Sequence, residues 1–391
     1  MVGTRLLAAL SILLAVGSTA SAAPASPCVE LAAAFDASTA PLFLASYPTA
    51  GPGPLKDTAF LYDNAVAAIA LVGCGDTAHA RRIGDAMLIA MDHDRYFHDG
   101  RLRNAYMAGP LDRPVKLSGW WDTMQNRWFE DGYQVASDNG NMAWAMLALL
   151  ALDRTTHDAR YRDGAVRLAG WTLQWQRRSG PGGFAGGTFD QEPSPKQNTW
   201  RSTEHNTDLA AAYTALARAT GDNRWLKPAR AAARFVRAMW HKSCRCYAVG
   251  TGLDGVTPNT LLALDAQVWP VLAHLDRAPP ATILTTVAAK LGQSGGYAYS
   301  EALQGLWTEG TAQVALLAML SGDTAKATAL AKVIDSMRTP HGGYYASNTP
   351  GLPTGFMLDT DPTKARQYFH IRALAPLAWT ALVERRFNPL R

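Results

Sequence analysis

Several carboxylates stand at the starts of apolar stretches of this chain, where their type and spacing could support acid–base chemistry. These carboxylates are Asp63, Asp138, Glu204, Asp265 and Glu309. Asp208 follows Glu204 by four residues, so in a helix the two side chains share a face with Cβ atoms about 5–6 Å apart. Two like charges in a half-buried site raise the pKa of one of them, which suits a general acid. Cleavage of a glycosidic bond uses one protonated and one ionised carboxyl group.

We therefore expect Glu204 to be a general acid and Glu309 a base, with Asp208 tuning the pKa of Glu204. Gly310 follows Glu309 directly, and a glycine lets the backbone approach a ligand closely. Two other interpretations stay open. A carboxylate at a helix start can cap the helix instead of serving a reaction. Asp208 can equally pair with a nearby arginine such as Arg201.

Polar and aromatic residues near the same positions could bind a sugar. Sugar hydroxyls bond to carboxylate, amide and imidazole groups, whereas the apolar faces of sugar rings stack on aromatic side chains. The polar candidates for substrate binding are Asp63, Asp138, Asn141, His205, Asp265, Gln313 and His370. The aromatic candidates are Trp121, Trp200, Trp307, Tyr297 and Tyr344. Tryptophans inside apolar stretches, such as Trp144, Trp269 and Trp379, are expected in the core.

The apolar stretches predict the elements that hold these side chains. They cover residues 65–71, 142–152, 209–219, 268–275, 314–320 and 371–383. Each follows a polar start, and the last start is Phe369-His370. A helix that is apolar on every side is buried on every side. Six such helices, all polar at the same end, predict a closed ring whose N-terminal ends meet in one cleft.

Amphipathic segments alternate with these apolar helices. They cover residues 79–91, 158–178, 224–240, 281–291 and 323–337, and residues 28–46 are expected to form a sixth. The result is an all-α fold of twelve alternating inner and outer helices. Connections from outer to inner helices are long, which is typical of functional loops. We expect short β-hairpins within them at Gly182-Gly183-Phe184, Gly295-Gly296-Tyr297 and Gly342-Gly343-Tyr344.

The N-terminal residues predict the compartment. Arg5, the apolar run 6–16 and the small residues Ala20-Ser21-Ala22 are typical of a secretory signal peptide, assigned to residues 1–22. We expect residues 23–391 to form one catalytic domain that is secreted or periplasmic. No later segment is long and apolar enough to span a bilayer. We expect a monomer.

The four cysteines allow three pairings in an oxidising compartment. We favour a disulfide between Cys28 and Cys74, because it would join the first outer helix to the first inner one. Cys244 and Cys246 would then close a very tight loop, or remain as free thiols. Neither this C-x-C sequence nor any His-rich stretch predicts a zinc site, and no cofactor is indicated.

The net charge of +5 does not predict nucleic-acid binding. Arg230, Arg234 and Arg237 lie on the polar side of one predicted outer helix, as expected of a solvated face. A basic stripe interleaved with aromatic residues, which would indicate a nucleic-acid site, is absent from the sequence.

The helical pattern and two motifs resemble the (α/α)6 six-hairpin glycosidase superfamily. The motifs are Trp307-Thr308-Glu309-Gly310-Thr311-Ala312-Gln313 and Ser202-Thr203-Glu204-His205-Asn206-Thr207-Asp208. The resemblance extends from Cys28 to Asn388, and no single family's catalytic signature is matched. It implies an (α/α)6 toroid with its acid and base at the N-terminal ends of inner helices. It also implies a carbohydrate-active enzyme, but it does not identify the substrate. From the carboxylates and aromatic residues we expect a hydrolase of poly- or oligosaccharides that inverts the anomeric configuration.

Other functions fit parts of the pattern. A polysaccharide lyase on the same toroid would use residues such as Tyr297, His205 and Arg201, and is the nearest rival. A sugar epimerase would be expected in the cytoplasm with paired catalytic histidines, of which His205 and His370 are the only candidates at inner-helix starts. A non-catalytic carbohydrate-binding protein would keep the aromatic residues without needing clustered acids. A terpene cyclase would need Asp-rich metal motifs, which the sequence lacks.

Overall fold

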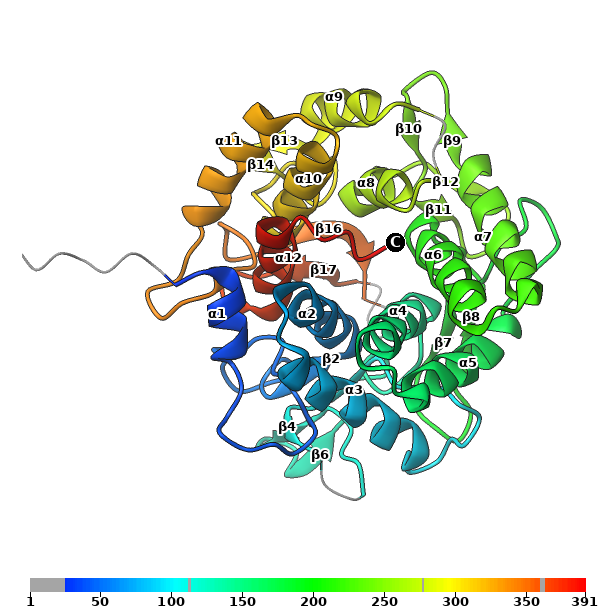
Figure 1. Ribbon diagram of the computed structural model, residues 1–391, viewed down its shortest axis with the longest axis vertical. Coiled ribbons are helices and arrows are strands. Elements are labelled where there is room, and N and C mark those ends of the chain that lie inside the picture. Colours follow the sequence, from blue (N-terminus) through cyan, green and yellow to red (C-terminus); the bar gives the residue numbers. More distant parts are fainter. Residues whose placement is uncertain (1–24, 112–113, 276–277, 359–362) are drawn as a thin grey trace, which may run out of the picture.

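Helices of two kinds alternate along the chain and form two concentric rings (Figure 1). The computed structural model describes residues 25–111, 114–275, 278–358 and 363–391, so the predicted signal peptide lies outside the described residues. The inner helices are α2 (Leu61–Cys74), α4 (Asn139–Thr156), α6 (Thr203–Thr220), α8 (Leu264–Leu272), α10 (Thr308–Leu320) and α12 (Leu374–Arg385). The outer helices are α1 (Pro27–Ala32), α3 (Thr77–Asp92), α5 (Ala159–Leu173), α7 (Leu226–Ala238), α9 (Pro280–Leu291) and α11 (Thr324–Asp335). A 3-10 turn, η1 (Asn223–Trp225), precedes α7.

The inner ring is closed. Each inner helix packs against the next one along the chain, and α12 packs against α2. The inner helices are buried as their all-round apolar sequences predict, and in α10 every residue from Thr308 to Ala318 is buried. The predicted all-α (α/α)6 toroid is therefore confirmed. None of the described helices has the length and hydropathy that a membrane span requires.

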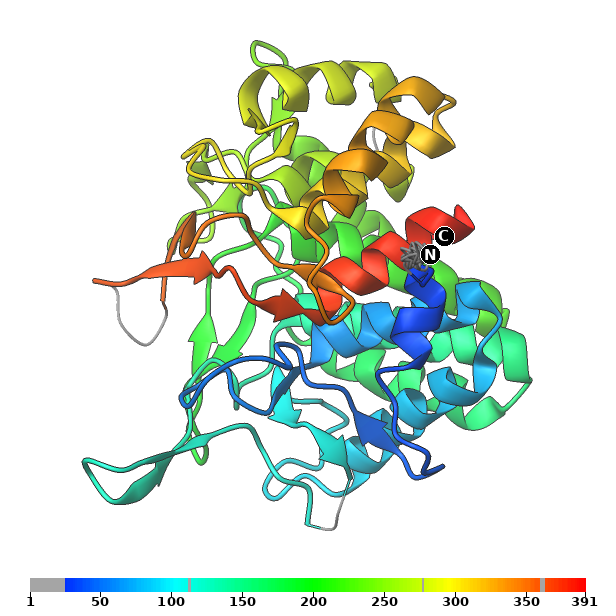
Figure 2. The same cartoon turned by 90° about the vertical axis from the view of Figure 1, so that its left-hand side faces the viewer.

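The long outer-to-inner connections carry short antiparallel strand pairs, as predicted. The pairs within the first half are β1 (Leu42–Phe43) with β4 (Gly109–Pro110), β2 (Thr58–Phe60) with β3 (Ala105–Met107), β5 (Trp120–Asp122) with β6 (Arg127–Phe129), and β7 (Gly187–Phe189) with β8 (Lys196–Asn198). The later pairs are β9 (Trp240–His241) with β10 (Cys246–Tyr247), β11 (Gly250–Thr251) with β12 (Pro258–Asn259), β13 (Gly292–Gln293) with β14 (Gly296–Tyr297), β15 (Tyr344–Tyr345) with β18 (Arg372–Ala373), and β16 (Leu352–Met357) with β17 (Ala365–Tyr368). Figure 2 shows the longer hairpins projecting on one side of the toroid, opposite both termini.

Two predicted helices are shorter than expected. The first outer helix ends at Ala32 instead of reaching residue 46. Asp36 ends it with a turn, because its carboxylate accepts the Ser38 N–H and binds the guanidinium of Arg82 at 2.6 Å. The last inner helix begins at Leu374 and not at Phe369-His370. Pro376 would stand in the second turn of a helix starting at residue 371, whereas it is tolerated in the first turn of α12.

Both cysteine pairs are joined. Cys28 and Cys74 form a disulfide that links α1 to the end of α2, which is the pairing favoured from the sequence. Cys244 and Cys246 form the second disulfide in the tight β9–β10 connection. The alternative of free thiols at this position is therefore wrong for the structure.

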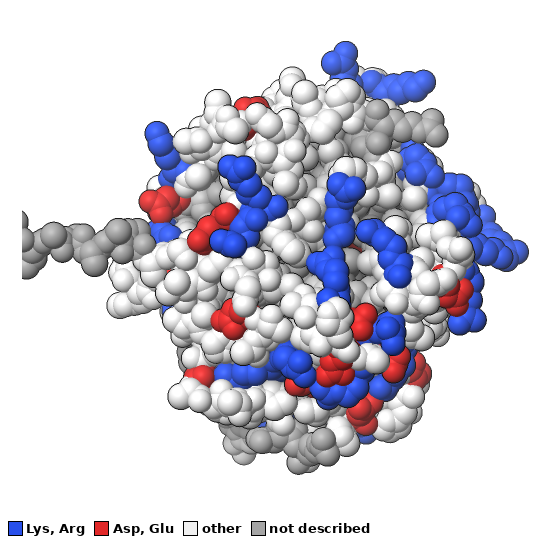
Figure 3. Space-filling model, in the orientation of Figure 1, with Lys and Arg blue, Asp and Glu red and all other residues white. Residues whose placement is uncertain are grey.

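The short inner-to-outer connections lie on the opposite side of the toroid from the hairpins. Figure 3 shows this side, on which Lys and Arg are spread over the surface with Asp and Glu among them. Arg230 and Arg234 of α7 are exposed, as predicted for its polar side. Interspersed charges of both signs are typical of a solvated surface.

Candidate active site

The N-terminal ends of the inner helices surround a cleft with two lobes. The first, here called the acidic lobe, has a volume of about 400 Å³ and is lined by Glu204, His205, Asp265 and Asp138. The second, here called the apolar lobe, has a volume of about 880 Å³ and is lined by prolines and aliphatic residues, together with Asp63. The residues that line both lobes are Tyr62, Tyr133, Asn141, Trp307, Glu309, Arg366 and Tyr368. Glu309 therefore stands at the junction.

The carboxylates of the cleft do not cap the inner helices. The N-cap residues of α2, α8 and α10 are Phe60, Ala263 and Trp307, and none of them makes a side-chain cap. Asp138 is the N-cap residue of α4, but its side chain makes no capping bond. Aspartates do cap helices of the outer ring. The side chains of the N-cap residues of α3, α5, η1 and α11 accept hydrogen bonds from backbone N–H groups of the first turn, and these residues are Asp76, Asp158, Asp222 and Asp323. The capping interpretation therefore applies to outer helices, and helix capping does not explain why carboxylates gather in the cleft.

Glu309 is 3 % exposed and is held by two donors. Its Oε1 accepts hydrogen bonds from the Tyr62 hydroxyl at 2.5 Å and from the Gln313 amide at 3.2 Å. Trp379 donates its indole N–H to the Tyr62 hydroxyl at 2.8 Å, which orients that hydroxyl. Burial raises the pKa of Glu309 to about 8, although the hydrogen bond from Tyr62 acts to lower it.

Glu204 lies in a different environment. No hydrogen bond or ion pair joins its carboxyl group to another described residue, and it lines the acidic lobe directly. Burial raises its pKa well above the ordinary value, and the charges of Asp265 and Asp208 raise it further. Of the two glutamates, Glu309 has the donors that favour the ionised form. Glu204 is the one whose surroundings favour the proton.

Asp208 lies one turn below Glu204 and does not reach the cleft surface. It is 0 % exposed, and neither of its oxygens has a hydrogen-bond partner among the described residues. Burial and the charge of Asp265 raise its pKa well above the ordinary value. Arg201 is not its partner, because that guanidinium binds the carbonyls of Ser179 and Gly182. The predicted Asp208–Arg201 pair is therefore absent, and the like-charged pair with Glu204 remains.

The remaining carboxylates differ in their surroundings. Burial raises the pKa of Asp63 to about 7 and that of Asp265 to about 6. Asp138 accepts a 3.3 Å hydrogen bond from Asn198, and Asn141 donates to Asn104 beside it. His205 is kept neutral, because burial lowers its pKa to about 4. Perturbed carboxyls gathered in one cleft are typical of a catalytic site.

Aromatic rings form the floor of the acidic lobe. Trp144 and Trp269 line it, with ring centroids 5.2 Å apart, and both contact the ring of Trp379 in α12. Trp200 and Trp307, which were predicted to bind sugar, also line the lobe. Trp144 and Trp269 are each 1 % exposed, so their predicted place in the core is confirmed, and in addition they lie against the lobe.

Several predicted site residues lie outside the acidic lobe. Tyr297 and Tyr344 are 4 % and 2 % exposed and belong to the packed base of the hairpins. Trp121 is exposed on the β5–β6 hairpin and lines neither lobe. Gln313 acts through Glu309 and does not reach the surface. His370 lies between β17 and β18, where it stacks on Tyr345 at 3.9 Å at the edge of the apolar lobe.

Gly310 also has a different role from the one predicted. A Cβ at this position would come within 2.1 Å of the Trp307 ring and 2.7 Å of Leu264. The missing side chain therefore lets α10 pack closely under Trp307, and the ligand is not involved. Gly140 has an equivalent role, because a Cβ there would meet the His205 ring at 2.5 Å.

The residues that sequence reasoning missed fall into two groups. Trp144 and Trp269 lie three and four residues after Asn141 and Asp265, so they share the cleft-facing side of α4 and α8, and this spacing is visible in the sequence. Tyr62 precedes Asp63 at the start of α2 and could have been found in the same way. Arg366 and Tyr368 enter the cleft from β17, and no local pattern indicates this.

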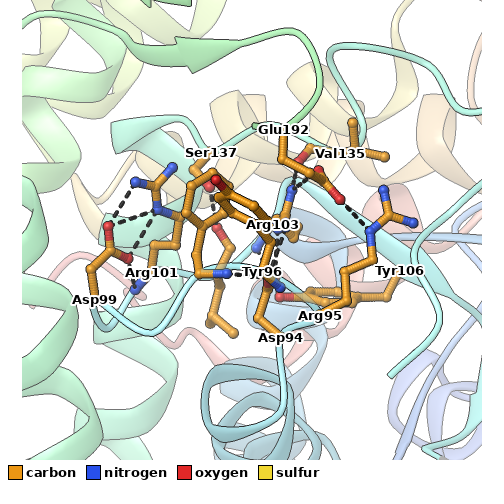
Figure 4. Close-up of polar contacts among 12 residues, drawn as sticks. Asp94, Arg95, Tyr96, Asp99, Arg101, Arg103, Tyr106, Val135, Ser137 and Glu192 are labelled. Atoms are coloured by element: carbon orange, nitrogen blue, oxygen red, sulfur yellow. Dashed lines mark hydrogen bonds and ion pairs between the residues drawn. The ribbon is translucent and has the colours of Figure 1, made fainter. Parts of the chain in front are cut away.

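A cluster of ion pairs fixes the connection on one side of the cleft (Figure 4). Arg103 is buried and binds Asp94 through two nitrogens, at 2.5 and 2.8 Å, and Glu192 at 3.1 Å. Arg95 binds both oxygens of Glu130 at 2.6 Å and also contacts Glu192. The cluster thus joins the end of α3 to the segments that carry β5–β6 and β7–β8.

Comparison with known proteins supports the fold. No protein-family model and no curated protein sequence matches the chain. Among solved structures, a glycosidase variant in complex with glucose is 16 % identical, with a TM-score of 0.61 over 92 % of this chain and 95 % of that one. An α-amylase from Clostridium perfringens is 9 % identical, with a TM-score of 0.63 over 92 % and 97 % of the two chains. A sugar epimerase from a ruminal bacterium is 11 % identical, with a TM-score of 0.62 over 92 % and 96 %. These likenesses show the (α/α)6 toroid fold.

Proposed function

We infer that the protein is a secreted or periplasmic glycoside hydrolase that acts on a poly- or oligosaccharide. The observation that carries this inference is the pair of glutamates at the cleft. Glu204 and Glu309 both line the acidic lobe, but only Glu309 has hydrogen-bond donors on its carboxylate. One acid and one base are what glycoside cleavage requires. The (α/α)6 neighbours named as glycosidases and as an amylase support the same chemistry by analogy.

The proposed reaction uses the two glutamates in one step. Glu204 gives its proton to the glycosidic oxygen, which leaves with the departing sugar as a hydroxyl group. Glu309 takes a proton from a water molecule, whose oxygen attacks the anomeric carbon from the opposite face. Water then restores the proton of Glu204 and removes that of Glu309. Glu204 belongs to α6 and Glu309 to α10, and α8 lies between these two helices. This arrangement favours the wider separation of the two carboxyl groups that is typical of an inverting enzyme, about 6.5–9.5 Å.

The other cleft residues bind and orient the sugar in this proposal. Asp138, Asn141, Asp265 and His205 offer hydrogen bonds to hydroxyl groups, and Trp144, Trp200 and Trp269 offer stacking surfaces. The predicted signal peptide supports the proposed secreted or periplasmic location. The two disulfides support it as well, because disulfides form mainly outside the cytoplasm.

Epimerisation of a sugar is the second candidate, because sugar epimerases, including a cellobiose 2-epimerase, share the toroid. The histidines favour hydrolysis. His205 lines the acidic lobe and His370 only the apolar lobe, so the cleft does not present two histidines to one sugar. The depressed pKa of His205 also makes it a poor proton donor at neutral pH.

Incubation with a panel of purified polysaccharides and their oligosaccharides tests the proposal. Hydrolysis increases the number of reducing ends, epimerisation leaves it unchanged, and a lyase produces unsaturated products that absorb ultraviolet light. Proton NMR during the first turnovers then reports the anomer released. We expect new reducing ends with inverted configuration. Products without new reducing ends, or with an absorbing double bond, would reject hydrolysis.

A further inference from the structure

The β5–β6 hairpin presents two tryptophans to solvent at the edge of the toroid. Trp121 is 54 % exposed and Trp128 is 46 % exposed. The two residues are direct cross-strand partners, so their side chains lie on the same face of the ribbon. Figure 2 shows the hairpin projecting on the side of the molecule that carries the other long hairpins. Large aromatic side chains that leave about half of their surface exposed, side by side, indicate a binding surface.

The ribbon is ordered without a partner. Its opposite face is built from Trp120 and Phe129, which stack with centroids 6.0 Å apart. Arg127 covers the Phe129 ring at 4.1 Å, and the Asp122 carboxylate organises the turn by accepting the N–H groups of the two residues that follow Thr123. The exposed tryptophans are therefore carried by a formed hairpin.

The exposed rings are also positioned individually. A Cβ at Gly119 would come within 2.6 Å of the Trp128 indole, so this glycine lets the ring lie against the backbone. Among the described rings, Trp121 and Trp128 do not stack on each other or on a third aromatic residue. Two flat apolar faces are thus held side by side and left open.

The base of the hairpin continues into the cleft wall. Asp131, Tyr133 and Gln134, which follow β6 within five residues, line the apolar lobe, and Tyr133 lines the acidic lobe as well. Glu130 is held between β6 and this wall by both nitrogens of Arg95, as part of the ion-pair cluster. The ribbon is therefore fixed in its position relative to the cleft.

We propose that Trp121 and Trp128 form a secondary binding site for a polysaccharide chain that extends out of the cleft past Tyr133. The apolar faces of pyranose rings stack on indole rings, and the exposed Thr123, Gln125 and Asn126 offer hydrogen bonds to hydroxyls at the ribbon tip. This site rests on the proposed function and makes it more specific. The substrate is then a polymer, because Trp121 and Trp128 line neither lobe of the cleft, and only a chain that continues beyond the cleft would contact both regions.

Affinity electrophoresis provides a test that does not depend on turnover. Native gels would contain soluble mixed-linkage β-glucan, xylan, α-mannan or dextran, and mobility would be compared with that in a gel without polysaccharide. We expect at least one polymer to retard the wild-type protein and the W121A/W128A variant to lose that retardation. M124A is the matched control, because Met124 is 95 % exposed on the same hairpin but offers no ring. W121F/W128F should retain part of the retardation.

Kinetics on the hydrolysed polymer supply the second measurement. We expect W121A/W128A to lose about tenfold in kcat/KM on the polymer, as the loss of two stacking contacts implies, with no change on a disaccharide of the same linkage. Equal losses on polymer and disaccharide, or retardation that persists in W121A/W128A, would overturn the proposal. So would a wild-type protein that no polymer retards.

Two further outcomes distinguish failure of the ribbon site from failure of the proposed hydrolase function. If sedimentation shows a wild-type dimer that becomes a monomer in W121A/W128A, the ribbon is a contact between copies of this chain, and the polysaccharide site is rejected. If a polymer retards the protein but no substrate gains reducing ends, the proposed hydrolase function fails while the ribbon site stands.

Discussion

Buried carboxylates occur in two regions of this molecule, and their surroundings shift the carboxyl pKa in opposite directions. In the ion-pair cluster, Asp94 and Glu192 face Arg103 and Arg95. Burial alone would raise the pKa of Asp94, but the hydrogen bonds and charge of Arg103 outweigh burial and lower it. In the cleft, no ion pair joins Glu204 or Glu309 to a cation of the described residues, and burial raises the pKa of both, although the charge of Arg366 acts to lower that of Glu204.

The comparison teaches how to separate structural from functional acids. A buried carboxylate costs folding free energy unless a cation or several donors compensate it. The ion-pair cluster is compensated and holds a connection in place. In the cleft, donors and charge compensate the acids only in part, and burial still raises the pKa of Glu204 and Glu309, which is typical of acids kept for binding or reaction. Substitutions in the two regions should therefore act on different quantities.

The largest expected effect is on turnover. E204Q and E309Q should each lower kcat by about three orders of magnitude or more, because each removes a proton transfer and a charge in the transition state. Thermal denaturation of E204Q should occur at or above the wild-type temperature, because Glu204 has no hydrogen-bond donor among the described residues, whereas E309Q should stay close to wild type, because the amide oxygen can still accept the Tyr62 hydrogen bond. The measurement is kcat on the polymer identified by the panel, with Tm from circular dichroism.

E301Q is the matched control, since Glu301 is an exposed glutamate in the same connection that leads to Glu309. Its activity should be unchanged. A variant at Glu204 or Glu309 that kept more than a tenth of the wild-type rate, a barrier change below about 1.4 kcal/mol, would not lack a catalytic residue. Asp138 or Asp265 would then take that role.

The next effect is on stability and belongs to the ion-pair cluster. D94N should lower the free energy of unfolding by about 3–5 kcal/mol at pH 7, because it removes the nearer of the two counter-ions of the buried Arg103 and leaves only Glu192. The folded-state pKa of Asp94 lies below its unfolded value, so its contribution is present at neutral pH and is lost as pH falls through the folded pKa. The difference in unfolding free energy between D94N and wild type should therefore narrow in acid, as urea titrations at several pH values can measure. A constant difference would indicate lost packing instead.

A smaller effect concerns the donor on Glu309. Y62F removes the 2.5 Å hydrogen bond and should raise the pKa of Glu309 above its value of about 8. A base that ionises later is less active at neutral pH, so kcat/KM at pH 7 should fall by about 10- to 100-fold, the range expected for a hydrogen bond to a charged group. Activity should recover toward the wild-type rate as pH rises. A loss that is the same at every pH would show that Tyr62 acts only in packing.

The sequence determined the ring and much of the cleft for a physical reason. Helices that are apolar on all sides must be buried, so the polar residues at their starts had to meet at one end, and Glu204, Asp265 and Glu309 do. The same logic failed for His370, because strand pairing between β15 and β18 took the residues before Leu374 out of the helix. Local sequence does not encode that pairing.

The acidic and aromatic residues of the cleft were not equally predictable. Trp144 and Trp269 were assigned to the core because an apolar helix position reads the same whether it faces a neighbour or a cavity. Arg366 enters the cleft from a hairpin, and its position depends on contacts between distant segments. By contrast, the pairing of Cys28 with Cys74 followed from the expected adjacency of α1 and α2.

The smallest expected effect tests the comparison most directly, because it repeats the Asp→Asn change of D94N at a buried acid in the other region. Asp208 is fully buried and makes no hydrogen bond of good geometry, and its folded-state pKa lies above the unfolded value even though the nearby Trp144 indole acts to lower it. Such a group contributes stability below its unfolded pKa and loses that contribution as pH rises through the folded pKa. D208N should therefore become more stable relative to wild type as pH rises above about 4, the opposite direction to D94N.

In kinetics, Glu204 loses a like-charged neighbour, so the alkaline limb of kcat/KM should move to lower pH while the maximal rate changes only a few-fold. If D208N were less stable than wild type at pH 8, Asp208 would have a partner in solution, and the division between compensated and uncompensated acids would not hold at this position.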